Sequence, residues 1–392
     1  MSRSMRERPP ERLPKRPIVV CLWGAHRPTP DLDSHQTPSN ADKGARELKT
    51  RGYEIKSISP WSRGKRRLQG WERKLQYILR VGDVLRAARK PGTVIYTADL
   101  AWIRVLSTLR RAGFLKGQRI VVHWGGIDFD PPSTASLPYR RHFDRLFAAA
   151  DAIWFASENE RRIWAETLPA HAARMAFHPM FVDLAYYRQI VPGTITYDVV
   201  ALGSDSRRDW ETPIQLAARG LQVALVTEDM DVRRRVMALP AAVSRNITLA
   251  FRAGFQQSAR IAASARCLLV ATTPNFRFSG SNTLGVAIAL RRPLVIDDPF
   301  DMPAYGLQAG VHHEAFDRGD PGSAYSAVLR VLSDSAYAAS LADALAAQSP
   351  LVDIDAFVDQ LEASFLPGWT AASTRDLTSG SRPATRLAPA WP

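Results

Sequence analysis

Two segments in the second half of the chain combine glycine, hydroxyl and guanidinium groups at spacings that could hold a phosphate. The first is Ala201-Leu-Gly-Ser-Asp-Ser-Arg-Arg-Asp-Trp210, which separates an apolar run from an amphipathic stretch. Gly203 would let a ligand approach the backbone closely. Arg207 and Arg208 would bring positive charge and paired donors that match a diphosphate. In the alternative interpretation Gly203 makes a plain turn and both arginines pair with the aspartates of the same segment.

The second segment is a short polar turn made of Ser279, Gly280, Ser281, Asn282 and Thr283. It also separates an apolar run from a helical pattern, so it would form the N-terminus of a helix. Free backbone N–H groups at such a terminus bind anions, and the hydroxyls of Ser281 and Thr283 could add hydrogen bonds. Turns of this composition are common loops. The prediction therefore depends on the first segment lying at the same level of the same sheet.

A third segment, Phe251-Arg-Ala-Gly-Phe255, ends another apolar run. The backbone that follows this run could border a flat nucleotide base, which makes Phe255 a candidate contact. An ordinary turn explains the same residues at least as well.

The first half of the chain offers candidates for a general base. His123 ends an apolar run, and two adjacent glycines lie between it and Asp128. His26 follows the first apolar run of the chain. Imidazole and carboxylate groups can take a proton from an acceptor hydroxyl. A single histidine or aspartate in a loop is more often a cap or turn residue, so these three residues stay candidates.

Several catalytic and metal-binding patterns are absent from the sequence. We find no phosphate-binding loop of the Walker type, no G-x-G-x-x-G after the first apolar run and no nucleophile elbow. The histidines and glutamate at 312–314 have no partners at metal-ligand spacing, so no metal site is predicted. The only cysteines, Cys21 and Cys267, lie in apolar runs, which excludes a disulfide framework and favours a reducing, cytoplasmic location. These absences point away from kinases, simple dehydrogenases and hydrolases.

Alternating apolar runs and amphipathic stretches would position the candidate residues. In the first half we predict strands at 18–23, 53–59, 93–97, 119–123 and 152–156, and helices at 40–51, 76–89, 98–111, 137–149 and 158–166. In the second half we predict strands at 197–202, 221–226, 247–251, 267–271 and 294–297, and helices at 213–219, 232–239, 258–265 and 283–290. Continuous apolar strands separated by helices indicate parallel sheets covered on both faces.

The predicted fold class is α/β, with two doubly wound Rossmann-like domains that face a central cleft. The first domain would span 17–190 and the second 191–348, with a basic, disordered N-terminal tail at 1–16 and a disordered C-terminal tail at 369–392. Ligands of such sheets bind beyond the carboxyl ends of the strands. All the candidate segments follow predicted strands.

The chain carries a formal charge of +14, which suggests an anionic partner. Residues 61–90 contain ten arginines and lysines, two acidic residues and several aromatic and aliphatic side chains. Such a segment suits an anionic membrane surface, although a solvated helix face explains it about as well. No stretch reaches the ~18 apolar residues of a membrane span. We therefore expect a cytoplasmic protein that can bind the inner face of the plasma membrane.

Three segments, taken in order and spacing, resemble the GT-B glycosyltransferases, and more narrowly their bacterial group-4-like branch. They are Phe177-His-Pro-Met-Phe-Val-Asp183, the segment from Ala201 to Trp210, and the stretch from Ser279 to Asp297 that includes Arg291-Arg-Pro293-Leu-Val-Ile-Asp297. The resemblance covers about residues 17–365. It is good in the second half and diffuse in the first.

The resemblance implies a different binding role for each of the two domains. The second domain would bind a nucleoside-diphosphate sugar, the first domain would bind the acceptor, and no other cofactor or metal would be needed. Arg208 falls where the family places a basic residue on the diphosphate, and the turn from Ser279 to Thr283 falls at the phosphate-binding loop. A C-terminal helix, here within 349–368, would cross back to the first domain.

The sequence also departs from the family pattern. Ser204 stands where a basic residue is usual, after Gly203. Phe278 and Val286 stand at the two positions, eight apart, where retaining members carry glutamates. We therefore expect an inverting or divergent transferase that uses Asp128 or His123 as its base.

The expected function is transfer of a sugar to a hydroxyl of a lipid-linked or polysaccharide acceptor in bacterial envelope or exopolysaccharide synthesis. Two alternatives are a non-catalytic nucleotide-sugar-binding partner of a polysaccharide assembly system and a nucleotide-sugar epimerase of the same fold. No nucleic-acid-binding module is recognisable, so nucleic acid is not an expected partner.

Overall fold

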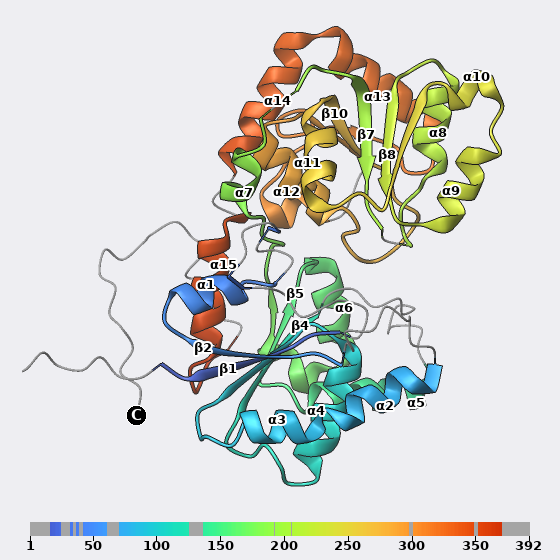
Figure 1. Cartoon of the computed structure of the whole chain (residues 1–392). Coiled ribbons are helices and arrows are strands. Elements are labelled where there is room, and N and C mark those ends of the chain that lie inside the picture. The colour runs from blue at the N-terminus through green and yellow to red at the C-terminus, as the bar shows by residue number, and fades with distance from the viewer. Residues whose placement is uncertain are drawn as a thin grey trace, which may run out of the picture.

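The computed structural model describes residues 16–24, 32–33, 37–38, 42–60, 70–124, 136–191, 193–204, 206–297, 301–348 and 352–370, with side chains from 75 onward in the segment that begins at 70. Within these residues the chain forms two α/β domains, one above the other in Figure 1. Each domain contains one six-stranded sheet in which every pairing is parallel. The predicted fold class is confirmed.

The first sheet has the strand order β2-β1-β3-β4-β5-β6. Its strands are β1 (Ile18–Leu22), β2 (Glu54–Ile58), β3 (Val94–Thr97), β4 (Arg119–Trp124), β5 (Ala152–Phe155) and β6 (Met175–Phe177). The helices of this half are α1 (Ala45–Thr50), α2 (Gly70–Leu79), α3 (Val81–Ala87), α4 (Leu100–Arg111), α5 (Leu137–Phe147), α6 (Glu158–Thr167) and the 3-10 helix η3 (Pro169–Arg174).

The second sheet has the order β12-β11-β10-β7-β8-β9. Its strands are β7 (Tyr197–Leu202), β8 (Val223–Thr227), β9 (Ile247–Phe251), β10 (Ala265–Val270), β11 (Leu294–Asp297) and β12 (Glu314–Phe316). The helices are α7 (Leu184–Arg188), α8 (Glu211–Ala218), α9 (Met230–Met237), α10 (Ala241–Ser244), α11 (Phe255–Ala263), α12 (Ser281–Leu290), the 3-10 helix η4 (Met302–Tyr305), α13 (Pro321–Ser333), α14 (Ser335–Ala347) and α15 (Ile354–Ser364).

Both faces of each sheet are covered, as continuous apolar strands require. Helices α2 to α6 pack on one face of the first sheet, and α1 and α15 pack on the other. In the second domain α7, α11 and α12 cover one face, while α8, α9 and α13 cover the other. α15 therefore belongs to the first domain in space, although it follows the second domain in sequence (Figure 1).

The structure differs from the predicted elements at several places. The expected helix at 76–89 begins at Gly70 and is divided at Arg80 into α2 and α3. The short strands β6 and β12 and the helix α7 had no periodic signal, because each spans five residues or fewer. α7 packs into the core of the second domain from within the predicted first domain. Trp369, the first residue of the predicted disordered tail, is buried and stacks on Trp154 at a centroid distance of 5.7 Å.

α15 is attached to the first domain by apolar packing and by arginine side chains, among them Arg51. Phe357 is 2% exposed and packs on the ring of Phe181 at 4.0 Å. On the outer side, Arg51 donates to the carboxylates of Asp355 (2.9 Å), Asp359 (2.5 Å) and Glu362 (3.1 Å). The three acids are spaced four and three residues apart, so they share one face of the helix.

We predict that apolar packing contributes more to this attachment than the ionic network. Phe357→Ala should lower the free energy of unfolding by about 3–5 kcal/mol, the usual cost of removing a buried phenyl ring. Arg51→Ala should cost about 1 kcal/mol, because two of its three acidic partners, Asp355 and Asp359, are largely in contact with water. Urea unfolding of both variants checks the order, with Leu329→Ala on the surface of α13 as control. Equal losses for the two variants would contradict it.

Candidate functional site

The carboxyl ends of strands from the two sheets meet where the domains touch. Tyr305, after β11, donates its hydroxyl to the carbonyl of Ala156, after β5 (2.9 Å). The side chain of Asn159 donates to the carbonyl of Phe276, after β10 (2.9 Å). Loops that follow strands in both domains therefore share one region, which is where ligands of doubly wound sheets bind.

Arg208 joins the two predicted phosphate-binding segments. Its Nη2 donates to Oγ1 of Thr283 at 2.7 Å, and that hydroxyl donates to the carbonyl of Leu202 at 3.1 Å. Gly203 leaves space for the guanidinium, because a Cβ at this position would lie 2.7 Å from Nε of Arg208. The arginine is 9% exposed. The structure thus brings Gly203, Arg208 and Thr283 together at the end of β7.

The buried carboxylate of Asp297 is linked to Arg208 through Thr272. Asp297, at the end of β11, accepts hydrogen bonds from the backbone N–H and the hydroxyl of Thr272 (2.9 and 2.6 Å) and from Nε of Arg318 (2.9 Å). Thr272 in turn forms an isolated antiparallel bridge with Arg208. The backbone of Arg208 is therefore fixed to the end of β10, which limits its movement relative to α12.

The carboxylate of Asp209 accepts hydrogen bonds at the N-terminus of α8. Its Oδ1 accepts from the backbone N–H groups of Glu211 and Thr212 (2.9 and 3.3 Å), and its Oδ2 accepts from the Thr212 hydroxyl (2.5 Å). Thr212 itself lies in the first turn of α8. The carboxylate of Asp209 performs the capping and is not an ion-pair partner of Arg208.

The turn from Ser279 to Thr283 forms the start of α12. Gly280 is the N-cap residue, and no side chain caps the helix. The first intrahelical bond runs from the Leu284 N–H to the Gly280 carbonyl, so the preceding N–H groups have no intrahelical acceptor. Ser279 is 4% exposed, and its hydroxyl has no hydrogen-bond partner among the residues that the structure describes. An anion at this terminus would meet backbone donors and at least one hydroxyl.

The remaining candidates of the second domain lie at different distances from this centre. Ser204 follows Gly203 and is exposed, and Arg207 is half-buried. Asn282 is exposed in the first turn of α12. Phe255 begins α11, after β9 and thus two strands away from β7, and is 41% exposed.

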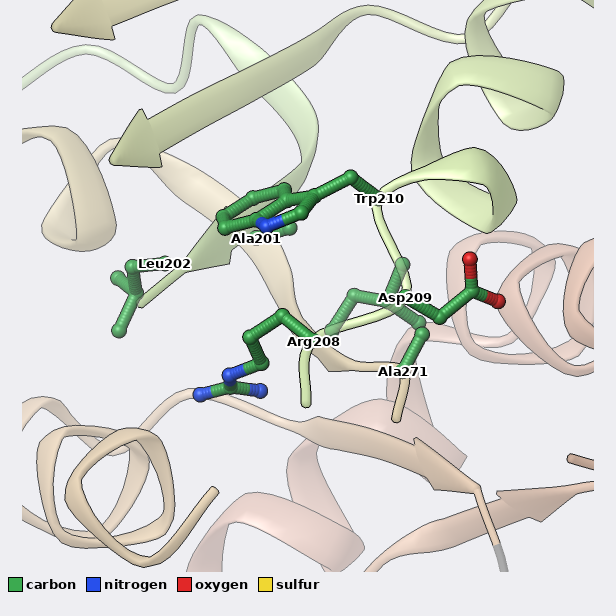
Figure 2. A pocket seen from close by; sticks show the side chains of 7 residues that line it. Ala201, Leu202, Arg208, Asp209, Trp210 and Ala271 are labelled. Atoms are coloured by element: carbon green, nitrogen blue, oxygen red, sulfur yellow. The ribbon is translucent and has the colours of Figure 1, made fainter. Parts of the chain in front are cut away.

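A small cavity behind Arg208 is not the ligand site. Figure 2 shows that Ala201, Leu202, Asp209, Trp210 and Ala271 line it together with the arginine. Its volume is about 10 Å³, which is roughly the space that one water molecule requires. The cavity is therefore too small for a nucleotide.

Phe278 and Val286 are parts of the hydrophobic core. Both are 7% exposed and belong to the core cluster that β10 and α12 form. The ring of Phe278 packs edge-on against Tyr305 at 5.2 Å. At these two positions, where the family resemblance leads one to expect carboxylates, the structure has only apolar groups that cannot accept hydrogen bonds from a sugar.

His123 is buried beneath α15. It is 2% exposed, its Nδ1 lies 3.4 Å from the hydroxyl of Tyr96, and its ring packs against Phe357 at 6.0 Å. Burial, with smaller contributions from Lys43 and His178, holds the pKa of His123 well below its usual value, so the imidazole is neutral. Direct contact with an acceptor would require the covering groups to move. The candidates His26 and Asp128 lie outside the described residues.

Glu160 is an ionisable group at the domain boundary that sequence reasoning missed. It is 3% exposed, and Nε1 of Trp124 donates to its Oε1 at 3.0 Å. Burial raises the pKa of Glu160 to about 8, and the nearby guanidinium of Arg277 from the second domain opposes this shift. In the sequence Glu160 is one acidic residue in the first turn of a polar helix, which gives no sign of burial.

Asp301 was also missed, and it joins the domains directly. Its carboxylate, 0% exposed, accepts from the Ser157 hydroxyl (2.6 Å) and the Asn159 backbone N–H (3.0 Å). A second-domain carboxylate therefore binds the N-terminus of α6, where the helix dipole favours negative charge. No local sequence pattern signals a contact between residues about 140 positions apart.

Two further findings concern the described residues alone. They contain no group of three or more histidine, cysteine or acidic side chains arranged to hold a metal ion. No helix among them combines the length and apolar character needed to cross a bilayer.

Comparison with known proteins gives similarity in structure only. No family model and no curated protein sequence matches the chain. HepE of Anabaena, solved with UDP and glucose, is similar at 14% identity over 88% of this chain and 98% of its own, with a TM-score of 0.64. Sucrose-phosphate synthase from Thermosynechococcus elongatus is 12% identical over the same shares, with a TM-score of 0.69. WaaG, a glycosyltransferase involved in lipopolysaccharide biosynthesis, is 13% identical over 90% and 100%, with a TM-score of 0.61.

We predict that Glu160 makes stability fall as the pH rises from about 5 to about 8. Its carboxyl keeps a proton in the folded state up to a pKa of about 8, whereas the unfolded chain releases that proton near pH 4.5. The folded state therefore binds more protons within this window, and its stability decreases with pH. Glu160→Gln should have a flatter stability profile between pH 5 and 8 and should gain most at pH 8.

Thermal unfolding across this pH range checks the prediction. Glu166→Gln, an exposed position on the same helix, is the matched control and should follow the wild type. Parallel profiles for Glu160→Gln and the wild type would show that Glu160 titrates normally.

Proposed function

The chain has the GT-B fold of these three proteins, and from this premise we propose that it transfers a hexosyl group from a nucleoside-diphosphate sugar to an acceptor hydroxyl. One observation carries the proposal: the buried guanidinium of Arg208 bonds Thr283 beside the uncapped N-terminus of α12. Guanidinium, hydroxyl and helix N–H donors at one point suit a diphosphate. The printed descriptions of HepE with UDP and with UDP-glucose support a nucleotide-sugar donor.

The proposed chemistry places negative charge at the end of β7. As the glycosidic bond breaks, the leaving diphosphate gains charge, and preorganised donors stabilise it more strongly than they stabilise the substrate. Arg208 and Arg207 supply the cationic side chains, and the first turn of α12 supplies N–H groups. Fixing Arg208 through Thr272 and Thr283 reduces the reorganisation needed during the reaction.

The first domain supplies the acceptor side in this proposal. Asp128, four residues after β4, is our first candidate for the base that deprotonates the acceptor hydroxyl, with His26 as the second. The burial of His123 makes it the weakest of the three. The acceptor we propose is lipid-linked or a polysaccharide, in envelope or exopolysaccharide synthesis. The description of WaaG as a lipopolysaccharide enzyme supports that class.

A second candidate function is binding of a nucleotide sugar without transfer. The apolar residues Phe278 and Val286 favour it, because they occupy the positions of the glutamates expected by resemblance. The two candidates share the same nucleotide site. They differ only in turnover.

We predict that Arg208→Ala and Thr283→Val each weaken the binding of a nucleoside diphosphate. Loss of a charge-assisted contact costs about 1.5–3 kcal/mol, or roughly tenfold to a hundredfold in affinity, and loss of the hydroxyl costs less. A thermal-shift screen over nucleoside diphosphates and their sugars identifies the ligand, and calorimetry gives the affinities. Arg245→Ala, an exposed arginine of the same domain, serves as control.

Turnover assays with the donor that this screen identifies separate the functions. Transfer to an added acceptor supports the enzyme, and release of nucleoside diphosphate should then fall in Arg208→Ala. Conversion of the donor without an acceptor identifies an epimerase. Binding without turnover on any acceptor identifies the non-catalytic partner. Unchanged affinity in both variants would exclude the proposed phosphate site.

A further inference from the structure

Helix α2 carries an apolar stripe on its solvent side. Leu75, Ile78 and Leu79 are 42%, 62% and 63% exposed. Their spacing of three and four residues places them on one face of the helix. The core face of α2 is a different one: Tyr77 is buried and packs edge-on against Trp102 at 5.1 Å. α2 is therefore apolar on two faces, and the described residues cover only one of them.

The helices beside α2 extend this surface with positive charge. α2, α4 and α5 belong to one layer, because Tyr77, Trp102 and Phe143 share a single core cluster on one face of the first sheet. Their opposite sides face away from the sheet. The exposed cationic side chains of α3, α4, α5 and the turn after α3 are Arg86, Arg89, Lys90, Arg104, Arg111, Arg140, Arg141 and Arg145.

Few acidic groups balance these cations. Within residues 75–90, 100–113 and 136–147 there are ten arginines and lysines and two aspartates. Asp83 pairs with Arg80 and Arg86, and Asp144 bonds His171. The pKa of His142, a residue of α5, is lowered by burial and further by Arg104 of α4 and Arg145 of α5, which is consistent with crowded positive charge.

We propose that the outward side of α2, α4 and α5 binds the anionic surface of a lipid bilayer. Aliphatic side chains surrounded by arginines match a head-group layer, which offers anionic phosphates above an apolar interior. Leu75, Ile78 and Leu79 enter the interface, and the arginines of α4 and α5 contact the phosphates. A nucleic acid would satisfy the charge but would leave the aliphatic stripe exposed to water.

This surface leaves the donor site free. It belongs to the first domain alone, and Figure 1 shows α2, α4 and α5 at the side of that domain, away from the second. A bound bilayer would bring the acceptor-binding domain to a lipid-linked acceptor. In that respect the inference deepens the proposed function, but it rests on the exposed residues and can be tested without any nucleotide or sugar.

The test is sedimentation of the full chain with vesicles of phosphatidylcholine, either alone or mixed with phosphatidylglycerol. We expect binding to the mixed vesicles only, weakened by added salt because charges near a surface are screened. Ile78→Ser with Leu79→Ser should weaken binding at least about tenfold, since two aliphatic side chains no longer enter the interface. Arg140→Glu with Arg141→Glu should weaken it by a similar factor.

The matched control is Met237→Ser, an exposed apolar residue of α9 in the second domain (72% exposed), which should bind vesicles like the wild type. All substituted residues are on the surface, so thermal unfolding should remain close to that of the wild type in every variant. Equal binding to both vesicle types, or unchanged binding by the Ile78/Leu79 variant, would overturn the proposal. So would binding of a nucleic acid that the Arg140/Arg141 variant loses while vesicle binding persists. Loss of vesicle binding with nucleotide binding intact would leave the proposed function standing.

Discussion

The requirement that both faces of a parallel sheet be covered determines how this molecule is assembled. The first domain places α2 to α6 on one face of its sheet, but α1 alone is too short to cover the other. α15 completes that cover after the chain has passed through the entire second domain. Arg119 of β4 donates to the carbonyl of Ser364 at the end of this helix. The chain therefore connects the two domains twice, before the second domain and again after it, where α15 returns to the first domain.

This assembly has consequences for the site. The N-terminus of α6 contacts Asp301 and the carbonyl of Phe276, so the loop that leads to the proposed phosphate-binding turn is held against the first domain. Within the second domain, Arg208 is held by Thr283 on one side and by the end of β10 on the other. The groups that we propose to bind the donor are thus held in place by contacts within the protein. The candidates that we propose for the acceptor side, His26 and Asp128, lie outside the described residues.

Much of the fold could be predicted because buried parallel strands leave continuous apolar runs, and the strands at 197–202, 247–251 and 294–297 agree with the structure to the residue. The approach of the segments around Arg208 and Thr283 followed from the rule that strands of one sheet end at one edge. Side-chain contacts between segments that no such rule brings together could not be predicted. Glu160 and Asp301 look like ordinary helix and loop residues, and their buried partners, Trp124 for Glu160 and Ser157 for Asp301, come from distant parts of the chain. His123 had the right residue type and position, but the helix that buries it is more than 200 residues away.

The central claim is that a nucleoside diphosphate binds between the end of β7 and the start of α12. A crystal structure of the chain with the nucleoside diphosphate that stabilises it most tests this claim directly. The account predicts phosphate oxygens within hydrogen-bonding distance of the Arg208 guanidinium and of backbone N–H groups in the first turn of α12. A diphosphate bound elsewhere, with Arg208 still bonded only to protein groups, would contradict it.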